Sequence, residues 1–542
     1  MIADERGADG AHTVGRWLTD RAAVSPGTVA VDDRGVTITY GDLEARAAAL
    51  AHRLEREGYR AGQRIATISG NSIDHIVAFF ACARTALAFV PLSWRLAPRE
   101  LAELIDRAAP ALVLVEDEYA ALAGDALGRL TRRPPVASLG TTGVEAAVPA
   151  PAAPPPAPPR PVRDDDPLLV IFTSGSEAAP KGVVLSHANC FWNNLALSGA
   201  SQLTADDVVL AMLPQFHVAA WNVQPLLAWW VGATVVLERS FQPGRVLQLI
   251  AERGVTAMMG VPTQYRQLAD DPRFGRGGLR TLRLALVGGA TMAPETAARW
   301  ADAGVVLTQG YGLTEASPNV LCLPAAEADA HPGAVGRPYP HVEVVLADPE
   351  TGLVLRGPAT GELWVRGPGV FAGYLDDPQA TARARCGEWL RTGDIAARDA
   401  EGVYRIVDRL KDIFISGGEN VAPAEVEQAL CRHPAVAEVA VVGAPDPVWG
   451  ERGVAFVVRA PGAVLGADEL LAHARGELAA YKVPVRIAFV DALPRTTIDK
   501  LARVRLRAHA ATLMTASAPA ADPAAGAAPI PIPTPSLEGD PA

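Results

Sequence analysis

Short apolar runs alternate with helical stretches along most of the chain, and this alternation constrains the fold more than any other feature. Residues 64–71, 88–92 and 111–117 have the pattern of strands. Residues 42–58 carry apolar side chains at helical spacing, and Asp42 is placed to cap that helix. Strands that alternate with helices predict α/β sheets whose faces are covered by helices.

The chain is too long for a single hydrophobic core. It has 542 residues, and single cores stop growing at about 250–300 residues. Proline-rich residues 148–164 interrupt the α/β pattern and predict an extended surface linker, because prolines suit neither helix nor sheet. We predict a large α/β region of several subdomains at 1–409, a small α+β domain at 410–508, and a disordered Ala/Pro-rich tail at 509–542.

Composition and charge argue against several classes of protein. The 49 Lys and Arg residues against 60 Asp and Glu residues give a net charge of −11, which disfavours nucleic acid or an anionic membrane as the main partner. The sequence shows no apolar run long enough for a membrane span and no signal peptide. The five scattered cysteines lack metal-ligand spacing, and they predict free thiols and a cytoplasmic location.

A loop suited to phosphate binding lies within residues 168–187, LLVIFTSGSEAAPKGVVLSH. A buried strand is predicted to end at Thr173, and the loop that follows offers backbone N–H groups, hydroxyls and one cation to phosphate oxygens. The loop residues are Ser174, Gly175, Ser176, Lys181 and Gly182. A Walker loop is excluded because Pro180 precedes the lysine and Gly182 follows it. The alternative is an ordinary turn between two strands.

The pattern T-S-G-S-x-x-x-P-K-G resembles the signature loop of the adenylate-forming superfamily, which includes acyl-CoA synthetases, peptide-synthetase adenylation domains and firefly-type luciferases. Further segments resemble the family's other motifs in the same order, and the resemblance spans residues 13–508. It implies a fold with a mobile small domain. It also implies activation of a carboxylic acid by ATP, with Mg²⁺, and transfer of the acyl group to coenzyme A (CoA).

Two of these segments resemble the walls of the acyl site. In LPQFHVAAWN, residues 213–222, the resemblance places His217 near the carboxylate and the thiol tunnel and makes Trp221 a gate of the acyl tunnel. For both residues the alternative is an ordinary core position. In LVGGATMAPE, residues 286–295, the resemblance assigns Gly289 and Ala290 to the adenine and acyl pockets.

The segment QGYGLTEAS, residues 309–317, resembles the motif that contacts adenine, phosphate and metal. The resemblance assigns the aromatic face of Tyr311 to adenine and the hydroxyl of Thr314 to the α-phosphate. Glu315 is a hard oxygen ligand suited to Mg²⁺. Gly310 and Gly312 are assigned to the nucleotide site, and Gly312 also to the acyl pocket.

Residues 389–427 resemble the region that holds the ribose and joins the two domains. The resemblance assigns Asp394 to the ribose hydroxyls, because two hydroxyls need a bidentate acceptor. Ile406 and Arg409 are assigned to the nucleotide, and Lys411 to the hinge. A later part of this segment, the loop with Gly417 and Gly418, resembles the lining of the pantetheine tunnel.

The segment LPRTTIDKLAR, residues 493–503, completes the resemblance. Lys500 resembles the lysine that neutralises the charge between the acyl carboxylate and the phosphate during adenylation. Several positions depart from the family pattern, among them Asp408 before Arg409, where glycine is common although an aspartate also occurs in acyl-CoA ligases. Glu177 adds a negative charge beside the triphosphate, Ala178 replaces a glycine, and Asp499 precedes the lysine where glycine is usual.

The sequence therefore predicts an ATP-dependent acyl-CoA ligase whose catalytic residues are Lys500, Thr314, Glu315 and His217. Its predicted partners are a carboxylic acid, ATP and CoA; a homodimer is left open. The acid is either a medium- or long-chain fatty acid or a bulky acid of secondary metabolism, such as antibiotic biosynthesis. Alternatives are an enzyme that only adenylates, a ligase for a carrier protein acting in trans, and a non-catalytic homologue that binds acyl groups or nucleotide.

Overall fold

The structure is a computed structural model. It describes residues 10–139, 148–152, 160–173, 180–275, 277–410, 412–416, 419–446, 449–478, 480–495 and 501–515. The chain divides into two compact units, unit 1 (Met1–Leu410) and unit 2 (Lys411–Ala542). Each unit is α and β in composition, as the sequence predicts, and each is described by itself.

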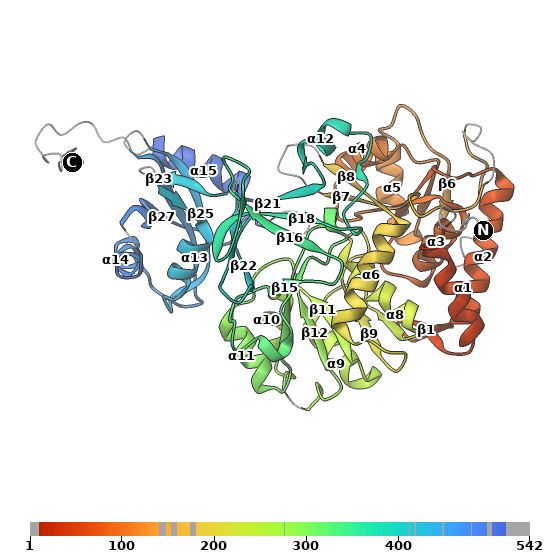
Figure 1. The fold of residues 1–542 in the computed structure, drawn as a ribbon, viewed down its shortest axis with the longest axis horizontal. Coiled ribbons are helices and arrows are strands. Elements are labelled where there is room, and N and C mark those ends of the chain that lie inside the picture. Colours follow the sequence, from red (N-terminus) through yellow and green to blue (C-terminus); the bar gives the residue numbers. More distant parts are fainter. Residues whose placement is uncertain are drawn as a thin grey trace, which may run out of the picture. The chain divides into compact units, whose positions relative to one another are not determined.

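The first sheet of unit 1 has a parallel centre and antiparallel edges (Figure 1). In spatial order its strands are β15 (Arg337–Pro338), β14 (Leu321–Cys322), β13 (Leu307–Tyr311), β12 (Leu284–Val287), β11 (Ala257–Gly260), β9 (Val208–Ala211), β10 (Thr234–Leu237), β1 (Val29–Asp33) and β2 (Val36–Thr39). Parallel strands must be joined by crossovers, and helices between these strands provide them.

The second sheet of unit 1 carries the predicted phosphate loop. Its strands, in spatial order, are β19 (Gly373–Tyr374), β8 (Lys181–Ser186), β7 (Pro167–Thr173), β4 (Ala88–Leu92), β3 (Arg64–Ile68), β5 (Leu112–Val115) and β6 (Val136–Ser138). All residues of β4 and β5 are buried, as expected for parallel strands covered on both faces. The three predicted strands at 64–71, 88–92 and 111–117 are confirmed as β3, β4 and β5.

The third sheet of unit 1 is antiparallel, and strand β19 of the second sheet falls between its strands in the chain. Its strands are β17 (Val354–Leu355), β16 (Glu343–Ala347), β18 (Ala359–Arg366), β21 (Trp389–Arg398) and β20 (Arg385–Cys386), with β22 (Tyr404–Arg409) paired to β21. Strand β21 brings the predicted ribose aspartate to the middle of this sheet.

Helices cover the sheets of unit 1, and Figure 1 shows the first three, in red, close together. They are α1 (Gly15–Val24), α2 (Tyr40–Glu57), α3 (Ile73–Thr85), α4 (Pro98–Ala108), α5 (Ala120–Leu127), α6 (His187–Ser201), α7 (Ala219–Asn222), α8 (Pro225–Val231), α9 (Pro243–Arg253), α10 (Pro262–Asp270), α11 (Pro294–Asp302) and α12 (Pro378–Arg383). Short 3₁₀ turns are η1 (Asp117–Tyr119), η3 (Thr314–Ala316) and η4 (Ala325–Glu327).

Helix α2 begins earlier than predicted. Thr39, not Asp42, is its N-cap, because the Thr39 side chain accepts a hydrogen bond from the Asp42 backbone N–H. The helix ends at Gly58, whose φ of 105° lies in the left-handed region that suits glycine.

The predicted proline-rich linker lies within unit 1 and is partly fastened to it. Val148 is buried in the core, contrary to the predicted surface position. The Tyr59 hydroxyl donates to the Pro149 carbonyl at 2.9 Å, and His12 pairs with Asp164 at 2.7 Å. The described parts of the linker therefore pack against the rest of unit 1. Val148 contributes an apolar side chain to the core, and Asp164 contributes a carboxylate to an ion pair.

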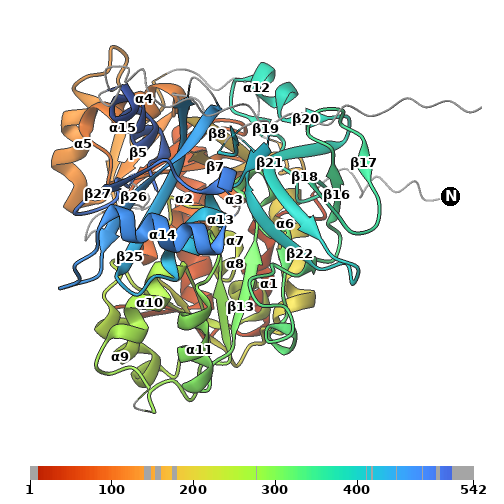
Figure 2. The same ribbon diagram turned by 90° about the vertical axis from the view of Figure 1, so that its left-hand side faces the viewer.

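Unit 2 is a small α+β domain built on one sheet. Its strands are β24 (Glu419–Val421), β23 (Phe414–Ser416), β26 (Gly450–Arg459) and β25 (Val436–Asp446), with β27 (Arg486–Phe489) paired to β26. Its helices are α13 (Pro423–Cys431), α14 (Ala467–Glu477) and α15 (Arg503–Thr515), with a short turn η5 (Ala480–Lys482). Figure 2 shows this unit in shades of blue.

The two faces of the β25–β26 pair bury different helices. Val441 belongs to the cluster that includes α13 and α14, whereas its neighbours Ala440 and Val442 belong to the cluster that includes α15. Successive strand residues point to opposite faces, so α15 covers the face opposite α13. Helix α15 continues to Thr515, and the prediction that disorder begins at 509 is wrong because Ala510 is buried against this sheet.

Among the residues that the structure describes, no helix combines the length and apolar character needed to cross a membrane.

Candidate active site

The predicted phosphate loop joins two antiparallel strands. Thr173 ends β7 and lies opposite Lys181, the first residue of β8, and the Thr173 hydroxyl approaches the Lys181 carbonyl at 3.5 Å. Ser174, Gly175, Ser176 and the unusual Glu177 and Ala178 fall outside the described residues. The structure thus describes the two ends of the loop, which lie side by side.

Lys181 and Glu315 both contact one tyrosine, Tyr374. The Lys181 Nζ atom is 5.3 Å from the ring centroid of Tyr374, and the Tyr374 hydroxyl donates to Glu315 Oε1 at 2.8 Å. The two predicted ligands are therefore brought together, with Thr314 beside them in η3. Tyr374 was not predicted from the sequence, since it lies 59 residues from Glu315 and only the pairing of β19 with β8 places it here.

Tyr311 and Arg409 both contact the carboxylate of Asp394. The Tyr311 hydroxyl donates to Asp394 Oδ2 at 2.6 Å, and Arg409 Nε lies 3.3 Å from Oδ1. Burial, and then the charge of Asp394, raises the pKa of Tyr311 well above its ordinary value, so the phenol stays protonated and donates. A carboxylate has about four acceptor positions, and this is the residue type that suits two ligand hydroxyls. Ile406 lies half-buried on the same strand as Arg409.

A buried glutamate supports the part of strand β21 that carries Asp394. Glu362 is 2% exposed and accepts hydrogen bonds from Trp364 Nε1 at 2.9 Å, from Arg391 Nη2 at 2.9 Å and from the Gly393 N–H at 3.2 Å. The backbone N–H of Asp394 donates to the Thr392 hydroxyl at 3.0 Å. Sequence reasoning missed Glu362; its only signal is a carboxylate within the buried part of strand β18.

The glycine-rich turn after β12 is held by one glutamine. Gly289 has φ 83°, in the left-handed region, and Ala290 is exposed. The Gln309 side chain, from the neighbouring β13, donates to the Ala290 carbonyl at 3.2 Å and accepts from the Met292 N–H at 3.1 Å. Gly310 follows Gln309 on β13. The turn and the segment around Tyr311 are therefore fixed to each other.

Gly312 is required by the protein backbone itself. A Cβ atom added to Gly312 would lie 1.5 Å from the carbonyl oxygen of Pro318. The sequence assigned Gly312 to ligand contact, but the contact with Pro318 explains the glycine without any ligand.

Asparagines on helices α6 and α7 hold the loops that carry these residues. The Asn193 side chain accepts from the backbone N–H of Asn319 at 3.2 Å and donates to the Asn222 carbonyl at 2.7 Å. The Asn222 side chain donates to the Ser317 carbonyl at 3.0 Å. These bonds fix the chain that leaves η3.

A third asparagine fixes the segment before β19. The Asn189 side chain donates to the carbonyls of Pro368 and Val370, at 2.8 and 2.9 Å. We name Asn189, Asn193 and Asn222 the amide cluster. Asn189 and Asn193 lie about one turn apart on α6, and Asn193 bonds to Asn222 of α7.

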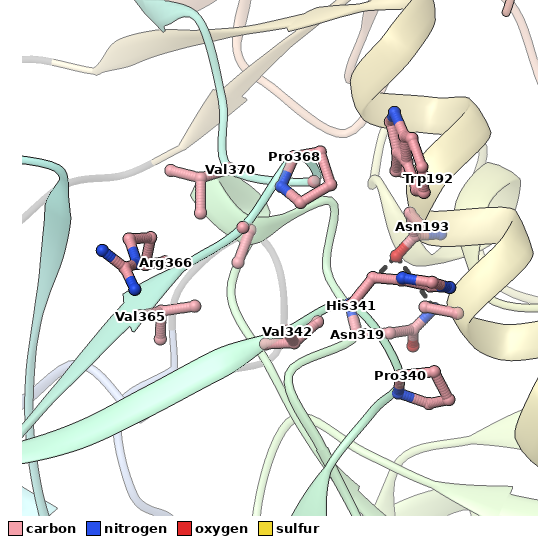
Figure 3. A pocket seen from close by; sticks show the side chains of 14 residues that line it. Trp192, Asn193, Asn319, Pro340, His341, Val342, Val365, Arg366, Pro368 and Val370 are labelled. Atoms are coloured by element: carbon pink, nitrogen blue, oxygen red, sulfur yellow. Dashed lines mark hydrogen bonds between the residues drawn. The ribbon is translucent and has the colours of Figure 1, made fainter.

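A small pocket, open to solvent, lies beside the amide cluster rather than at the predicted nucleotide site (Figure 3). Asn193 and Asn319 lie on one wall with Trp192 and His341, and Val365 and Val370 lie on another. None of the predicted site residues lines it.

His217 and Trp221 have different environments. His217 is half-buried, and its ring lies 4.6 Å from that of Phe216. Trp221 has no exposed surface: its indole stacks on Phe79 at 4.5 Å, and its N–H donates to the Gln215 carbonyl at 2.6 Å. The structure thus supports the core alternative for Trp221 rather than a position at a tunnel wall.

The predicted residues of unit 2 fall outside the described residues: Lys411, Gly417, Gly418, Asp499 and Lys500. The chain on either side of residues 496–500 is described. Arg495 and Leu501 form a β-bridge, and Arg495 pairs with Glu438 at 2.9 Å. Arg503 pairs with Glu427 at 2.8 Å.

Within the described ranges, no group of three or more His, Cys, Asp or Glu side chains could hold a metal ion. Mg²⁺ needs fewer protein ligands, because it typically binds through one or two carboxylates and the phosphates of its substrate. Glu315 fits that donor set: Oε1 accepts from Tyr374, and Oε2 has no hydrogen-bond partner among the residues that the structure describes.

Comparison with known proteins defines the class of this one. The AMP-binding enzyme family matches residues 18–375, and the C-terminal domain of AMP-binding enzymes matches residues 425–500. The first match alone covers more than half of the chain. The chain therefore belongs to the AMP-binding enzyme family.

Its relatives narrow the class further. Feruloyl-CoA synthase from Amycolatopsis sp. is 40% identical over 495 residues, which are 91% of this chain and 98% of that protein. Indoleacetate–CoA ligase from Aromatoleum aromaticum is 35% identical over 499 residues, 91% of this chain and 97% of that protein. The crystal structure of ATP-bound MatB from Rhodopseudomonas palustris is similar with a TM-score of 0.84 and 31% identity, over 92% of this chain and 98% of that chain. The protein is an acid–thiol ligase, an acyl-CoA synthetase of this family.

Proposed function

We propose that the protein activates an aromatic or other bulky carboxylic acid with ATP and transfers the acyl group to CoA. The observation that carries the proposal is the 40% identity to a feruloyl-CoA synthase over nearly the full length of both proteins. The indoleacetate–CoA ligase supports it, because that relative is also named for an aromatic acid.

In the proposed first half-reaction, the acid attacks ATP. A carboxylate oxygen forms a bond to the α-phosphorus, the bond to the bridging oxygen breaks, and pyrophosphate leaves with the electron pair. Asp394 accepts the ribose hydroxyls, Tyr311 offers its face to adenine, and Thr314 donates to the α-phosphate. Lys181, with Ser174–Ser176, holds the other phosphates, and Lys500 neutralises charge between the two reacting anions.

In the proposed second half-reaction, the CoA thiolate attacks the acyl carbonyl and AMP leaves. Unit 2 rotates about Lys411 between the two steps, which is a hinge motion. That rotation withdraws Lys500 and brings the Gly417–Gly418 loop to the thiol. His217 lies beside the acyl carboxylate. Gly289 and Ala290 leave room for the acyl group.

Glu315 would hold Mg²⁺ with the phosphates of ATP. When bound, the ion would neutralise negative charge on the phosphates. Glu177 would oppose this effect if it faced the phosphates: the repulsion of two charges at 4 Å is about 1 kcal/mol in water and about 4 kcal/mol at an effective dielectric of 20.

The substrate is tested by acid-dependent ATP–pyrophosphate exchange over a panel of hydroxycinnamic, arylacetic, polycyclic and straight-chain fatty acids. We expect the strongest exchange with an aromatic or polycyclic acid. Strongest exchange with a fatty acid would support the fatty-acid alternative. No exchange with any acid would overturn adenylation and favour a non-catalytic, ligand-binding homologue.

The acceptor is tested by adding CoA without any carrier protein and measuring the thioester. Thioester formation would eliminate the carrier-only and adenylation-only alternatives, and its absence would eliminate CoA as the acceptor.

The role of Lys500 is tested with a matched control, because the chain has only four lysines. Lys500→Ala should abolish exchange but retain thioester formation from preformed acyl-adenylate and CoA. Lys482→Ala removes the one lysine outside the predicted site, which pairs with Glu425 at 2.6 Å, and should leave exchange unchanged. Undiminished exchange by Lys500→Ala would refute the assignment.

A further inference from the structure

One short segment holds Glu315 at two points. The Phe371 backbone N–H donates to the Glu315 carbonyl at 2.8 Å, and the Tyr374 hydroxyl donates to the Glu315 carboxylate at 2.8 Å. Both the main chain and the side chain of Glu315 are therefore oriented by residues 371–374.

The same segment is part of the sheet that carries Lys181. Strand β19 pairs with β8, with Tyr374 opposite Val183, two residues from Lys181. The Lys181 ammonium lies 5.3 Å from the centroid of the Tyr374 ring, within the range of a cation–π interaction. Tyr374 thus contacts the lysine with its ring and the glutamate with its hydroxyl.

Packing alone does not account for the Tyr374 hydroxyl. Phe371 is fully buried and anchors the segment in the core, and its ring lies 5.0 Å from that of Tyr374. Tyr374 and Glu315 are only half-buried. A phenylalanine at 374 would keep the ring contacts with Phe371 and Lys181 and would lose the hydrogen bond to Glu315.

We propose that Tyr374 is a positioning residue for the divalent cation that accompanies ATP: its hydroxyl fixes the Glu315 carboxylate, and its ring fixes Lys181. The inference rests on the proposed assignment of Glu315 to the cation. A partner that orients a metal-ligating carboxylate commonly contributes 10–100-fold to metal affinity. Because a hydrogen bond holds one oxygen of Glu315, the carboxylate loses less rotational freedom when it binds the cation.

The test measures nucleotide binding with and without a cation, using Mn²⁺ as the probe. Binding of ATP is followed by calorimetry in EDTA and over a Mn²⁺ titration, and protein-bound Mn²⁺ by electron paramagnetic resonance. Tyr374→Phe should raise the half-saturating Mn²⁺ concentration about tenfold and leave ATP affinity in EDTA unchanged. Tyr374→Leu should in addition weaken ATP binding in EDTA about two- to fivefold, because Lys181 loses the ring.

The matched control is Tyr59→Phe. It also removes a tyrosine hydroxyl that donates a hydrogen bond, to the Pro149 carbonyl at 2.9 Å, and should leave the Mn²⁺ dependence unchanged. A Tyr374→Phe protein with the wild-type Mn²⁺ dependence would overturn the proposal. So would an equal loss of ATP affinity with and without Mn²⁺, since that result indicates a purely structural role.

The same titration separates this inference from the proposed function. Wild-type protein that binds no ATP under any condition would overturn both. Wild-type protein that binds ATP with Mn²⁺, but makes no acyl-adenylate from any acid, would count against the proposed function; the Tyr374→Phe shift would then still decide the role of Tyr374.

Discussion

Replacing Gly312 by alanine should damage the site without touching a ligand. The added Cβ atom would lie 1.5 Å from the Pro318 carbonyl oxygen, whereas Cβ contacts under 3.0 Å essentially never occur. The two backbone segments would have to separate by at least about 1.5 Å. Forced overpacking of this kind costs about 1–3 kcal/mol or more, and displacement of a catalytic group by about 1 Å can reduce a rate about 100-fold.

We therefore expect Gly312→Ala to lower the free energy of unfolding of unit 1 by at least about 1–3 kcal/mol. ATP–pyrophosphate exchange should fall by about 100-fold. The first quantity is measured by denaturant titration and the second by isotope exchange.

Helix α5 offers a control: a glycine-to-alanine substitution that is expected to raise the stability of the protein instead of lowering it. Gly124 is exposed, and a Cβ atom there would have no neighbour within 4 Å. Gly124→Ala should stabilise the protein by about 0.5–1 kcal/mol, because alanine favours the helix, and should leave exchange unchanged. Wild-type stability and exchange in Gly312→Ala would refute the steric explanation.

Three further results are expected. Glu362→Ala should destabilise unit 1 by about 2–3 kcal/mol and weaken ATP binding, since it strips the Gly393 N–H and Arg391 of their buried acceptor; unchanged unfolding and calorimetry would contradict this. A thiol reagent should label exposed Cys386 in the folded protein but not buried Cys190, whose pKa burial raises to about 12; labelling of Cys190 before unfolding, detected by mass spectrometry, would refute it. Burial lowers the pKa of His75 from 6.5 to about 4. Between about pH 6.5 and pH 4 the unfolded chain therefore binds a proton at His75 that the folded chain does not bind. Stability should then decline by up to about 3 kcal/mol, and denaturant titrations of His75→Gln should show a shallower decline than wild type.

The strands of the second sheet could be predicted because they are buried on both faces. Parallel strands covered by helices appear as unbroken apolar runs, and β4 and β5 are such runs; β3 has the same buried character from residue 65 on, although Thr67 interrupts its apolar sequence. The ends of helices were harder to predict. Thr39 and Asp42 are both good capping residues, and only the backbone geometry identifies Thr39 as the cap. The last turns of α15 could not be predicted, because an Ala-rich segment suits both helix and disorder until its burial is known.

The candidate site could be predicted only where a residue belongs to a recognisable motif. Tyr311 and Asp394 were named in separate motifs, and the structure places them in hydrogen-bond contact although 83 residues separate them. Tyr374 and Glu362 belong to none of the recognised motifs, and Gln309 begins the segment 309–317 but was assigned no role there; the roles of all three follow from strand pairing and from hydrogen bonds. Trp221 shows the opposite case, in which a motif position is occupied by a residue of the core.

The amide cluster has a consequence for the response of the site to salt. Salt bridges near a protein surface weaken as ions screen them, with a screening length of about 8 Å at 0.15 M. Asn189, Asn193 and Asn222 are uncharged, so their hydrogen bonds to the segment before β19 and to the chain that leaves η3 are nearly insensitive to ionic strength. A measured decrease in nucleotide affinity at high salt would therefore report on the charges of ATP and its ligands, and not on a distortion of the loop that presents Glu315.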